Sequence, residues 1–121
     1  MRPCLLSVPA ALFVALPAFA QFQAPQPSSS ATFTQRIGLT DVSVSYSRPN
    51  VRGRAIWGGL VPFDQPWRTG ANLATTVTFS DDVIVEGQKL AAGTYALVTI
   101  PGKSDWKVIF NKDTKLWWET Q

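Results

Sequence analysis

The sequence has no histidine and a single cysteine in 121 residues, and these absences exclude several kinds of chemistry. Without histidine, the chain cannot activate a serine or cysteine nucleophile in the usual way, and a zinc site built from His and Cys cannot form within it. One cysteine cannot close an intramolecular disulfide. A metal site would depend on carboxylates and carbonyls, but the acids are scattered, and Asp81-Asp82, the one adjacent pair, is typical of a turn. We expect no metal site and no cofactor.

Charge is also scarce. Charged residues make up 16% of the chain, the formal net charge is +3, and no run of like charges occurs. A nucleic-acid-binding surface needs a concentrated basic patch. We therefore expect no nucleic-acid partner.

The one long apolar run lies at the N-terminus. Residues 5–19 are mostly apolar, Arg2 precedes them, and Ala18 and Ala20 supply small residues near their end. This arrangement predicts a secretory signal peptide over residues 1–20. We expect the protein to be exported, to the periplasm or outside the cell.

The apolar run is poorly suited to a permanent anchor. It is shorter than the ~20 residues that span a bilayer, and Pro9 and Pro17 interrupt it. Cys4 precedes the run, so it is poorly placed to be the acylated cysteine of a lipoprotein and should leave with the signal. We expect no stable membrane anchor after cleavage.

The rest of the chain divides into a short leader and one domain. Residues 21–30 contain two prolines and three serines and predict a flexible leader. Residues 31–121 suit a single domain with a modest core.

Alternating polarity predicts that this domain is all-β. In the segment 41–47, Val42, Val44 and Tyr46 point to one face and serines point to the other. Turn residues separate further strand-like runs, and no long segment has helical periodicity. We predict a single antiparallel β-sandwich or partly open barrel. Its remaining strands are expected at residues 32–37, 74–79, 83–85, 94–100 and 106–110.

Two aromatic residues have specific expected places in this fold. Tyr95 begins a run that is apolar on both faces, which predicts a buried central strand. Trp106 begins the next strand and should pair with it across the hairpin at residues 101–105.

A long segment rich in Gly and Pro, residues 49–73, contains the most distinctive motif. Residues 58–72 read Gly-Gly-Leu-Val-Pro-Phe-Asp-Gln-Pro-Trp-Arg-Thr-Gly-Ala-Asn. Together with Tyr-Ser-Arg-Pro at 46–49, Ala-Gly-Thr-Tyr at 92–95 and Ile-Pro-Gly-Lys at 100–103, this motif resembles the bacterial family called domain of unknown function 2911. The resemblance covers residues 31 to about 118 and implies an exported β-rich protein. It brings no established reaction, ligand or catalytic residue.

The chain differs from this family in two respects. Phe63 and Pro66 stand where relatives commonly have tyrosine and valine, and Phe63 lacks a hydroxyl that could donate a proton. Family members also continue for further strands, so the resemblance implies a C-terminally truncated sandwich. An exposed edge strand would then permit self-association, and one of Trp117 and Trp118 would be exposed and adhesive.

The candidate binding residues lie in and beside the motif. Arginine binds carboxylates, sulfates or phosphates through two parallel hydrogen bonds, and tryptophan faces stack on sugar rings or guanidinium groups. A small anion or a carbohydrate is therefore the expected ligand. The candidates are Arg48, Arg54, Trp57, Trp67, Arg68 and Asn72, with Arg52 beside them.

A structural role for the same residues remains open. Trp57 and Trp67 could cap one end of the sandwich, with the arginines paired to Asp41 and Asp64 or stacked on the rings. Arg68 and Asn72 could project from one rigid loop beside Gly70, or they could satisfy carbonyls and amides of that loop.

Three classes of function fit this sequence. The first is a non-catalytic module that binds an envelope or extracellular ligand. The second is a structural or protein-interaction module of the cell envelope. The third is a hydrolase or lyase that uses carboxylates and arginine, for which a glycosidase would need two carboxylates roughly 5 to 10 Å apart. Only Asp41 and Asp64 lie near the motif, and we assign no catalytic residue.

Overall fold

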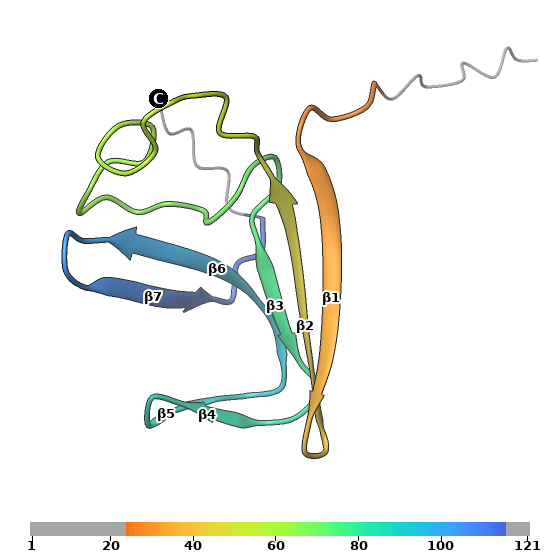
Figure 1. Ribbon diagram of the computed structural model, residues 1–121. Coiled ribbons are helices and arrows are strands. Elements are labelled where there is room, and N and C mark those ends of the chain that lie inside the picture. The colour runs from red at the N-terminus through yellow and green to blue at the C-terminus, as the bar shows by residue number, and fades with distance from the viewer. Residues whose placement is uncertain (1–23, 116–121) are drawn as a thin grey trace, which may run out of the picture.

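The computed structural model describes residues 24–115, and all regular structure in this range is β. Five strands form an antiparallel sheet in the order β1-β2-β3-β6-β7, and two form a separate hairpin, β4-β5 (Figure 1). The sheet is not closed, so β1 and β7 are its edges in the described part of the chain. The prediction of an all-β antiparallel fold is confirmed. The strands are β1 (Ser29–Ile37), β2 (Thr40–Arg48), β3 (Thr76–Phe79), β4 (Val83–Val85), β5 (Gln88–Leu90), β6 (Gly93–Pro101) and β7 (Trp106–Asn111).

Several sequence predictions concern the chain ends. The predicted signal peptide at residues 1–20 and the pair Trp117-Trp118 lie outside the described residues. β1 begins at Ser29, so the sheet includes the last two residues of the segment 21–30 predicted as a leader. Within residues 24–115, no helix is long and apolar enough to cross a membrane.

One face of the sheet is apolar from strand to strand. Val44 of β2 lies between Phe33 of β1 and Val77 of β3. Val77 in turn lies opposite Tyr95 of β6, and the ring of Phe110 from β7 packs edge-on against Tyr95 at 6.3 Å. The alternation of the sequence thus gives every one of the five strands an apolar residue on this face.

The core lies at the middle of this face. Val77, Phe79 and Tyr95 are buried, and Tyr95 is only 4% exposed, which confirms the prediction of a core position. The Tyr95 hydroxyl donates a hydrogen bond to the Ala91 carbonyl at 2.8 Å, so the polar end of the ring is satisfied. Full burial of a large apolar side chain stabilises a fold by about 1.5–3 kcal/mol. The partly buried residues packed against this cluster are Val42, Val44, Val83, Leu90, Leu97 and Phe110.

The opposite face of β1, β2 and β3 carries hydroxyl groups. Thr34 and Ser43 share a hydrogen bond of 2.7 Å across β1 and β2, and Thr78 and Thr94 share one of 2.8 Å across β3 and β6. Farther along β6, this face becomes apolar and Val98 is buried. Burial on both faces confirms that β6 is a central strand.

Two turns explain the arrangement of the last four strands. Pro101 pairs with Trp106, which confirms the predicted hairpin between β6 and β7. The β4-β5 turn places Glu86 at φ 48° and Gly87 at φ 75°, the pattern of a type I′ turn. Gln88 follows this turn as the first residue of β5.

Candidate functional site: a tryptophan cluster beside β6

The long segment between β2 and β3 is tied to β6, an interior strand of the sheet. The Trp67 amide donates to the Thr99 carbonyl at 2.7 Å, and the Thr99 amide donates back to the Trp67 carbonyl at 2.9 Å. The Asp64 amide donates to the Pro101 carbonyl at 2.8 Å. The segment therefore continues the ladder on the β3 side of β6, and it lies beyond the ends of β2 and β3 in Figure 1. This packing against the sheet explains why the segment between β2 and β3 is so long.

The first half of the motif forms a compact coil. The Val61 amide donates to the Ile56 carbonyl at 2.8 Å, and the Gly58 amide donates to the Val61 carbonyl at 2.9 Å. Gly58 has φ 75°, and a Cβ at this position would lie 2.8 Å from the Phe63 ring. Only glycine suits this backbone and this close approach. The coil fixes the position of Trp57, which lies within it.

Three tryptophans meet at this end of the sheet. The ring centroids of Trp57 and Trp67 are 5.6 Å apart, and those of Trp57 and Trp106 are 4.9 Å apart. The interplanar angles are 83° and 71°, so both pairs have the edge-to-face arrangement that aromatic rings favour. Trp57 is 51% exposed and Trp106 is 46% exposed, whereas Trp67 is partly buried. The cluster therefore presents two half-exposed rings on a third that is anchored to β6.

Trp106 was not among the sequence-predicted site residues. The sequence identified it as the start of a strand, and it joins the cluster because Pro101 faces Trp106 while Thr99 pairs with Trp67. Trp67 and Trp106 flank β6 on opposite sides, but their partners Thr99 and Pro101 are two residues apart, so both tryptophans lie on the same face of the sheet. The predicted hairpin at residues 101–105 could have indicated that Trp106 lies beside the end of β6. The pairing of Trp67 with Thr99 could not be predicted, because no local sequence pattern indicates it.

Arg68 and Asn72 hold the motif together. Nη1 of Arg68 donates to the Asn72 carbonyl at 2.9 Å, and Nδ2 of Asn72 donates to the Ser28 carbonyl at 3.1 Å. Asn72 also has a left-handed backbone, with φ 58°. These contacts favour the structural alternative for both residues, in which side chains satisfy loop carbonyls.

The remaining arginines are exposed. Nε of Arg54 donates to the Val51 carbonyl at 3.0 Å, and Nη2 donates to the Asn50 carbonyl at 2.7 Å. Arg48 is the last residue of β2, and Arg52 lies in the following turn. Arg54 therefore uses two of its donors on its own loop.

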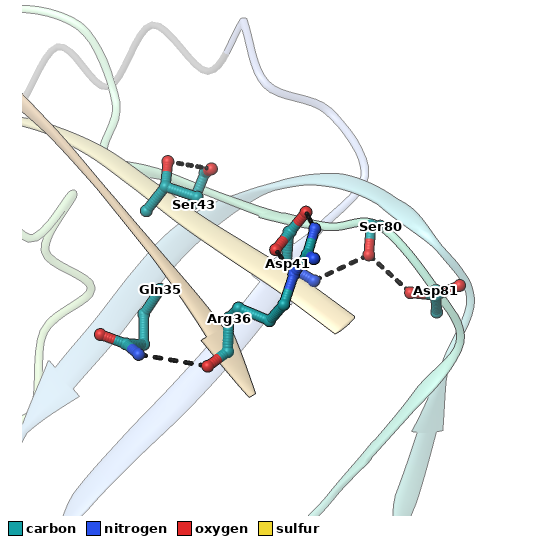
Figure 2. A network of polar contacts seen from close by, with 7 residues as sticks. Gln35, Arg36, Asp41, Ser43, Ser80 and Asp81 are labelled. Carbon is teal, nitrogen blue, oxygen red and sulfur yellow. Dashed lines mark hydrogen bonds and ion pairs between the residues drawn. The ribbon is translucent and has the colours of Figure 1, made fainter. Parts of the chain in front are cut away.

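The expected pairing of these arginines with Asp41 or Asp64 is wrong. Among residues 24–115 the one ion pair joins Nε of Arg36 to Oδ1 of Asp41 at 2.7 Å, with a second contact from Nη2 to Oδ2 at 2.8 Å (Figure 2). Asp41 and Arg48 lie near opposite ends of β2, roughly 23 Å apart for an extended strand. The hydrogen bond from Arg36 lowers the pKa of Asp41, and the same contact raises the pKa of Arg36.

The two acids nearest the motif in sequence do not face each other. Asp41 lies at the end of the sheet where β6 begins, whereas the Asp64 amide is bonded to Pro101 at the other end of β6. The length of β6 separates these ends by roughly 26 Å. This separation is too large for the carboxylate pair of a glycosidase, which needs roughly 5 to 10 Å.

The adjacent acids Asp81 and Asp82 have structural contacts. Asp81 accepts a hydrogen bond from the Ser80 hydroxyl, as Figure 2 shows, and Asp82 accepts one from the Ala92 amide at 2.8 Å. In the part of the chain that the structure describes, no three His, Cys, Asp or Glu residues gather to form a metal site.

An open antiparallel sheet with a motif-bearing segment packed on its central strand defines a small, all-β domain. The chain matches the family model described as "Protein of unknown function (DUF2911)" over residues 28–121, and it belongs to this family. This match confirms the resemblance carried by the motif at residues 58–72. No curated protein and no solved structure matches the chain.

Proposed function

We propose that this domain is an exported, non-catalytic binding module for an envelope or extracellular carbohydrate, with Trp57 and Trp106 as its contact surface. The observation that supports this proposal is a pair of half-exposed tryptophan rings at 4.9 Å, both packed on Trp67. Exposed aromatic rings on a rigid frame lose little conformational entropy on binding, which favours their use as contact residues. The apolar faces of sugar rings are suitable partners for such a surface.

The hydrogen bonds of the arginines favour a carbohydrate over a small anion. Binding of a carboxylate or phosphate in a bidentate way requires the paired N–H groups of a guanidinium. Arg54 and Arg68 both donate to carbonyls of the motif segment. The tryptophans are therefore the better contact residues, with Arg48 and Arg52 available at the periphery of the segment.

The test is a thermal melt of the chain with a panel of glycans and small anions. A ligand that binds the native state raises the melting temperature. We expect a glycan to raise it in the parent, and we expect Trp57→Ala and Trp106→Ala each to weaken binding about tenfold or more, which corresponds to about 1.4 kcal/mol.

Leu73→Ala is the matched control, because Leu73 is an exposed apolar residue of the same segment. It should retain the glycan shift. The proposal is contradicted if no glycan shifts the melt, or if both tryptophan variants keep the full shift. A response to anions alone, abolished by Arg48→Ala, would favour an anion-binding module.

A protein-interaction module is the second candidate, and β7 is the observation that favours it. This strand is an edge of the described sheet, and it exposes Trp106, Val108 and Ile109. An exposed apolar edge strand can pair with a strand of another chain. We propose that copies of the chain associate through β7.

Analytical ultracentrifugation over a range of concentrations tests this second candidate. The parent should associate, and Val108→Lys with Ile109→Lys should remain monomeric because charge on an edge strand opposes pairing. Lys107→Arg keeps the charge of the same strand and should associate as the parent does. A monomeric parent at high concentration would exclude this mode of interaction.

A further inference from the structure

A second surface feature lies away from the motif, between the β4-β5 hairpin and the last two strands of the sheet. It consists of two adjoining grooves of about 630 Å³ and about 340 Å³. Leu90 and Phe110 line both, so the two parts meet at these side chains. Val83 and Tyr95 line the larger part, and Trp106 lines the smaller part. Figure 1 shows the β4-β5 hairpin below β7, extending in the same direction.

The walls of this groove are mainly apolar. Leu90 and Phe110 are partly buried members of the core cluster, and Val108 in the smaller part is 55% exposed. Ligand sites in proteins typically have volumes of about 300–1,000 Å³ and mainly apolar walls. Both the size and the lining of the groove fit a small apolar ligand.

Charge is distributed unequally along the groove. Lys89 and Lys112 line the larger part, together with Asp82. Oδ1 of Asp82 accepts a hydrogen bond from the Ala92 amide at 2.8 Å, so this carboxylate already has a backbone partner. Glu86 lines the smaller part. The larger part of the groove, with Lys89 and Lys112, is therefore suited to an anionic group of a ligand. The smaller part, with Glu86, disfavours such a group.

We propose that this groove binds a single-chain anionic amphiphile with the chemistry of a fatty acid. The carboxylate lies between Lys89 and Lys112, and the alkyl chain follows Leu90 and Phe110 toward Trp106. Each methylene that leaves water raises the affinity about fourfold, so the chain supplies most of the binding and the lysines supply direction and selectivity. The site is separate from the carbohydrate surface proposed above, although Trp106 lies at the boundary of both.

Isothermal titration calorimetry of the full chain tests this proposal with three twelve-carbon probes used below their micelle concentrations. Dodecanoate is the expected ligand. Dodecanol lacks the charge, and dodecyltrimethylammonium carries the opposite charge on the same chain length. We expect dodecanoate to bind saturably and at least about tenfold more tightly than the cation, a difference of about 1.4 kcal/mol.

Two variants locate the ligand. Lys89→Glu with Lys112→Glu should weaken dodecanoate at least about tenfold and abolish the preference over the cation. The matched control reverses the charges of Lys103 and Lys107, which do not line the groove, and should bind dodecanoate within about twofold of the parent.

Val108→Glu places a charge in the path of the alkyl chain and should weaken the binding of all three probes. Val108 is exposed, so this variant should melt cooperatively as the parent does.

Several results would overturn the proposal. The proposal is wrong if the anion and the cation bind with equal affinity, or if the Lys89/Lys112 variant binds dodecanoate as tightly as the parent does. It is also wrong if that variant and its matched control lose the same amount of dodecanoate affinity. Another such result is that the groove is occupied by a second copy of the chain, seen as a stable dimer that dodecanoate does not dissociate. Lys89 and Lys112 lie outside the tryptophan cluster, so the Lys89/Lys112 variant should keep glycan binding, and failure here is distinguishable from failure of the carbohydrate site.

Discussion

Thr69 is the residue at which the motif segment is most constrained. It is β-branched and has φ 58°, a backbone region that costs such residues about 1–3 kcal/mol. Its hydroxyl contacts the Trp67 carbonyl at 3.2 Å and the Thr99 hydroxyl at 3.0 Å, and its carbonyl accepts from the Thr75 hydroxyl at 2.9 Å. These contacts hold Thr69 in its unfavourable conformation and hold Trp67 against β6.

Removal of the Thr69 hydroxyl should therefore loosen the tryptophan cluster. Thr69→Val keeps the shape of the side chain but leaves partners without a hydrogen bond, and it should lower the free energy of unfolding by about 1–2 kcal/mol. Thr69→Ser keeps the hydroxyl and should lie closer to the parent. Urea denaturation measures both, and a valine variant as stable as the serine variant would show that the hydroxyl does not hold the segment.

Asp41 gives a pH-dependent contribution to stability. Its pKa in the folded protein is lowered by the hydrogen bond from Arg36, so the contribution is complete above the unfolded value of about 3.9 and is lost as pH falls through the folded pKa. The raised pKa of Arg36 acts only at strongly alkaline pH. The stability difference between the parent and Asp41→Asn should be constant near neutrality and should shrink below about pH 4. Melts from pH 7 to pH 2 measure it, and a difference that does not change with pH would contradict the assignment.

At the level of elements, the period-two pattern was sufficient wherever a strand is long or has an apolar face. It located β1, β2, β3, β6 and β7 because the buried side of each strand carries the alternation, and the short apolar run Val83–Val85 located β4. It missed β5 because Gln88, Lys89 and Leu90 include one apolar residue and no β-branched or aromatic residue, unlike the equally short β4. It also missed the pairing of Trp67 with Thr99, which depends on hydrogen bonds between distant segments.

The turn between β4 and β5 can be tested directly. Glu86 has φ 48° in a type I′ turn, where asparagine is favoured and most other residues are strained. Glu86→Asn should raise the free energy of unfolding by about 0.5 kcal/mol, because asparagine adopts this backbone more easily. Glu86→Ala is the matched control and should not stabilise. If urea denaturation gives the same change in the free energy of unfolding for both substitutions, the turn conformation is not the cause of the stabilisation.

At the level of the whole molecule, the sequence predicted part of the candidate site. It selected Trp57 and Trp67 from the motif, and the structure brings them together. It could not select Trp106, because this contact depends on how the motif segment pairs with β6. It gave the arginines and Asn72 equal weight with the tryptophans. The hydrogen bonds of Arg54 and Arg68 within the segment, and that of Asn72 to Ser28, become visible only once the backbone is known.

The two ends of the sheet carry different side chains. The end with Arg36 and Asp41 closes a hairpin with an exposed ion pair, and the opposite end carries the three tryptophans. Our central claim is that Trp57 and Trp106 contact a carbohydrate at that opposite end. A measurement that resolves single residues distinguishes binding there from binding elsewhere.

The most direct measurement is a nitrogen-15 NMR titration that follows the indole N–H signals and the backbone amides while glycans are added. We predict that the indole signals of Trp57 and Trp106 shift with one saturable binding curve, while the amides of Arg36 and Asp41 do not move. Unchanged indole signals at saturating glycan, or shifts confined to residues outside the tryptophan cluster, would contradict the claim.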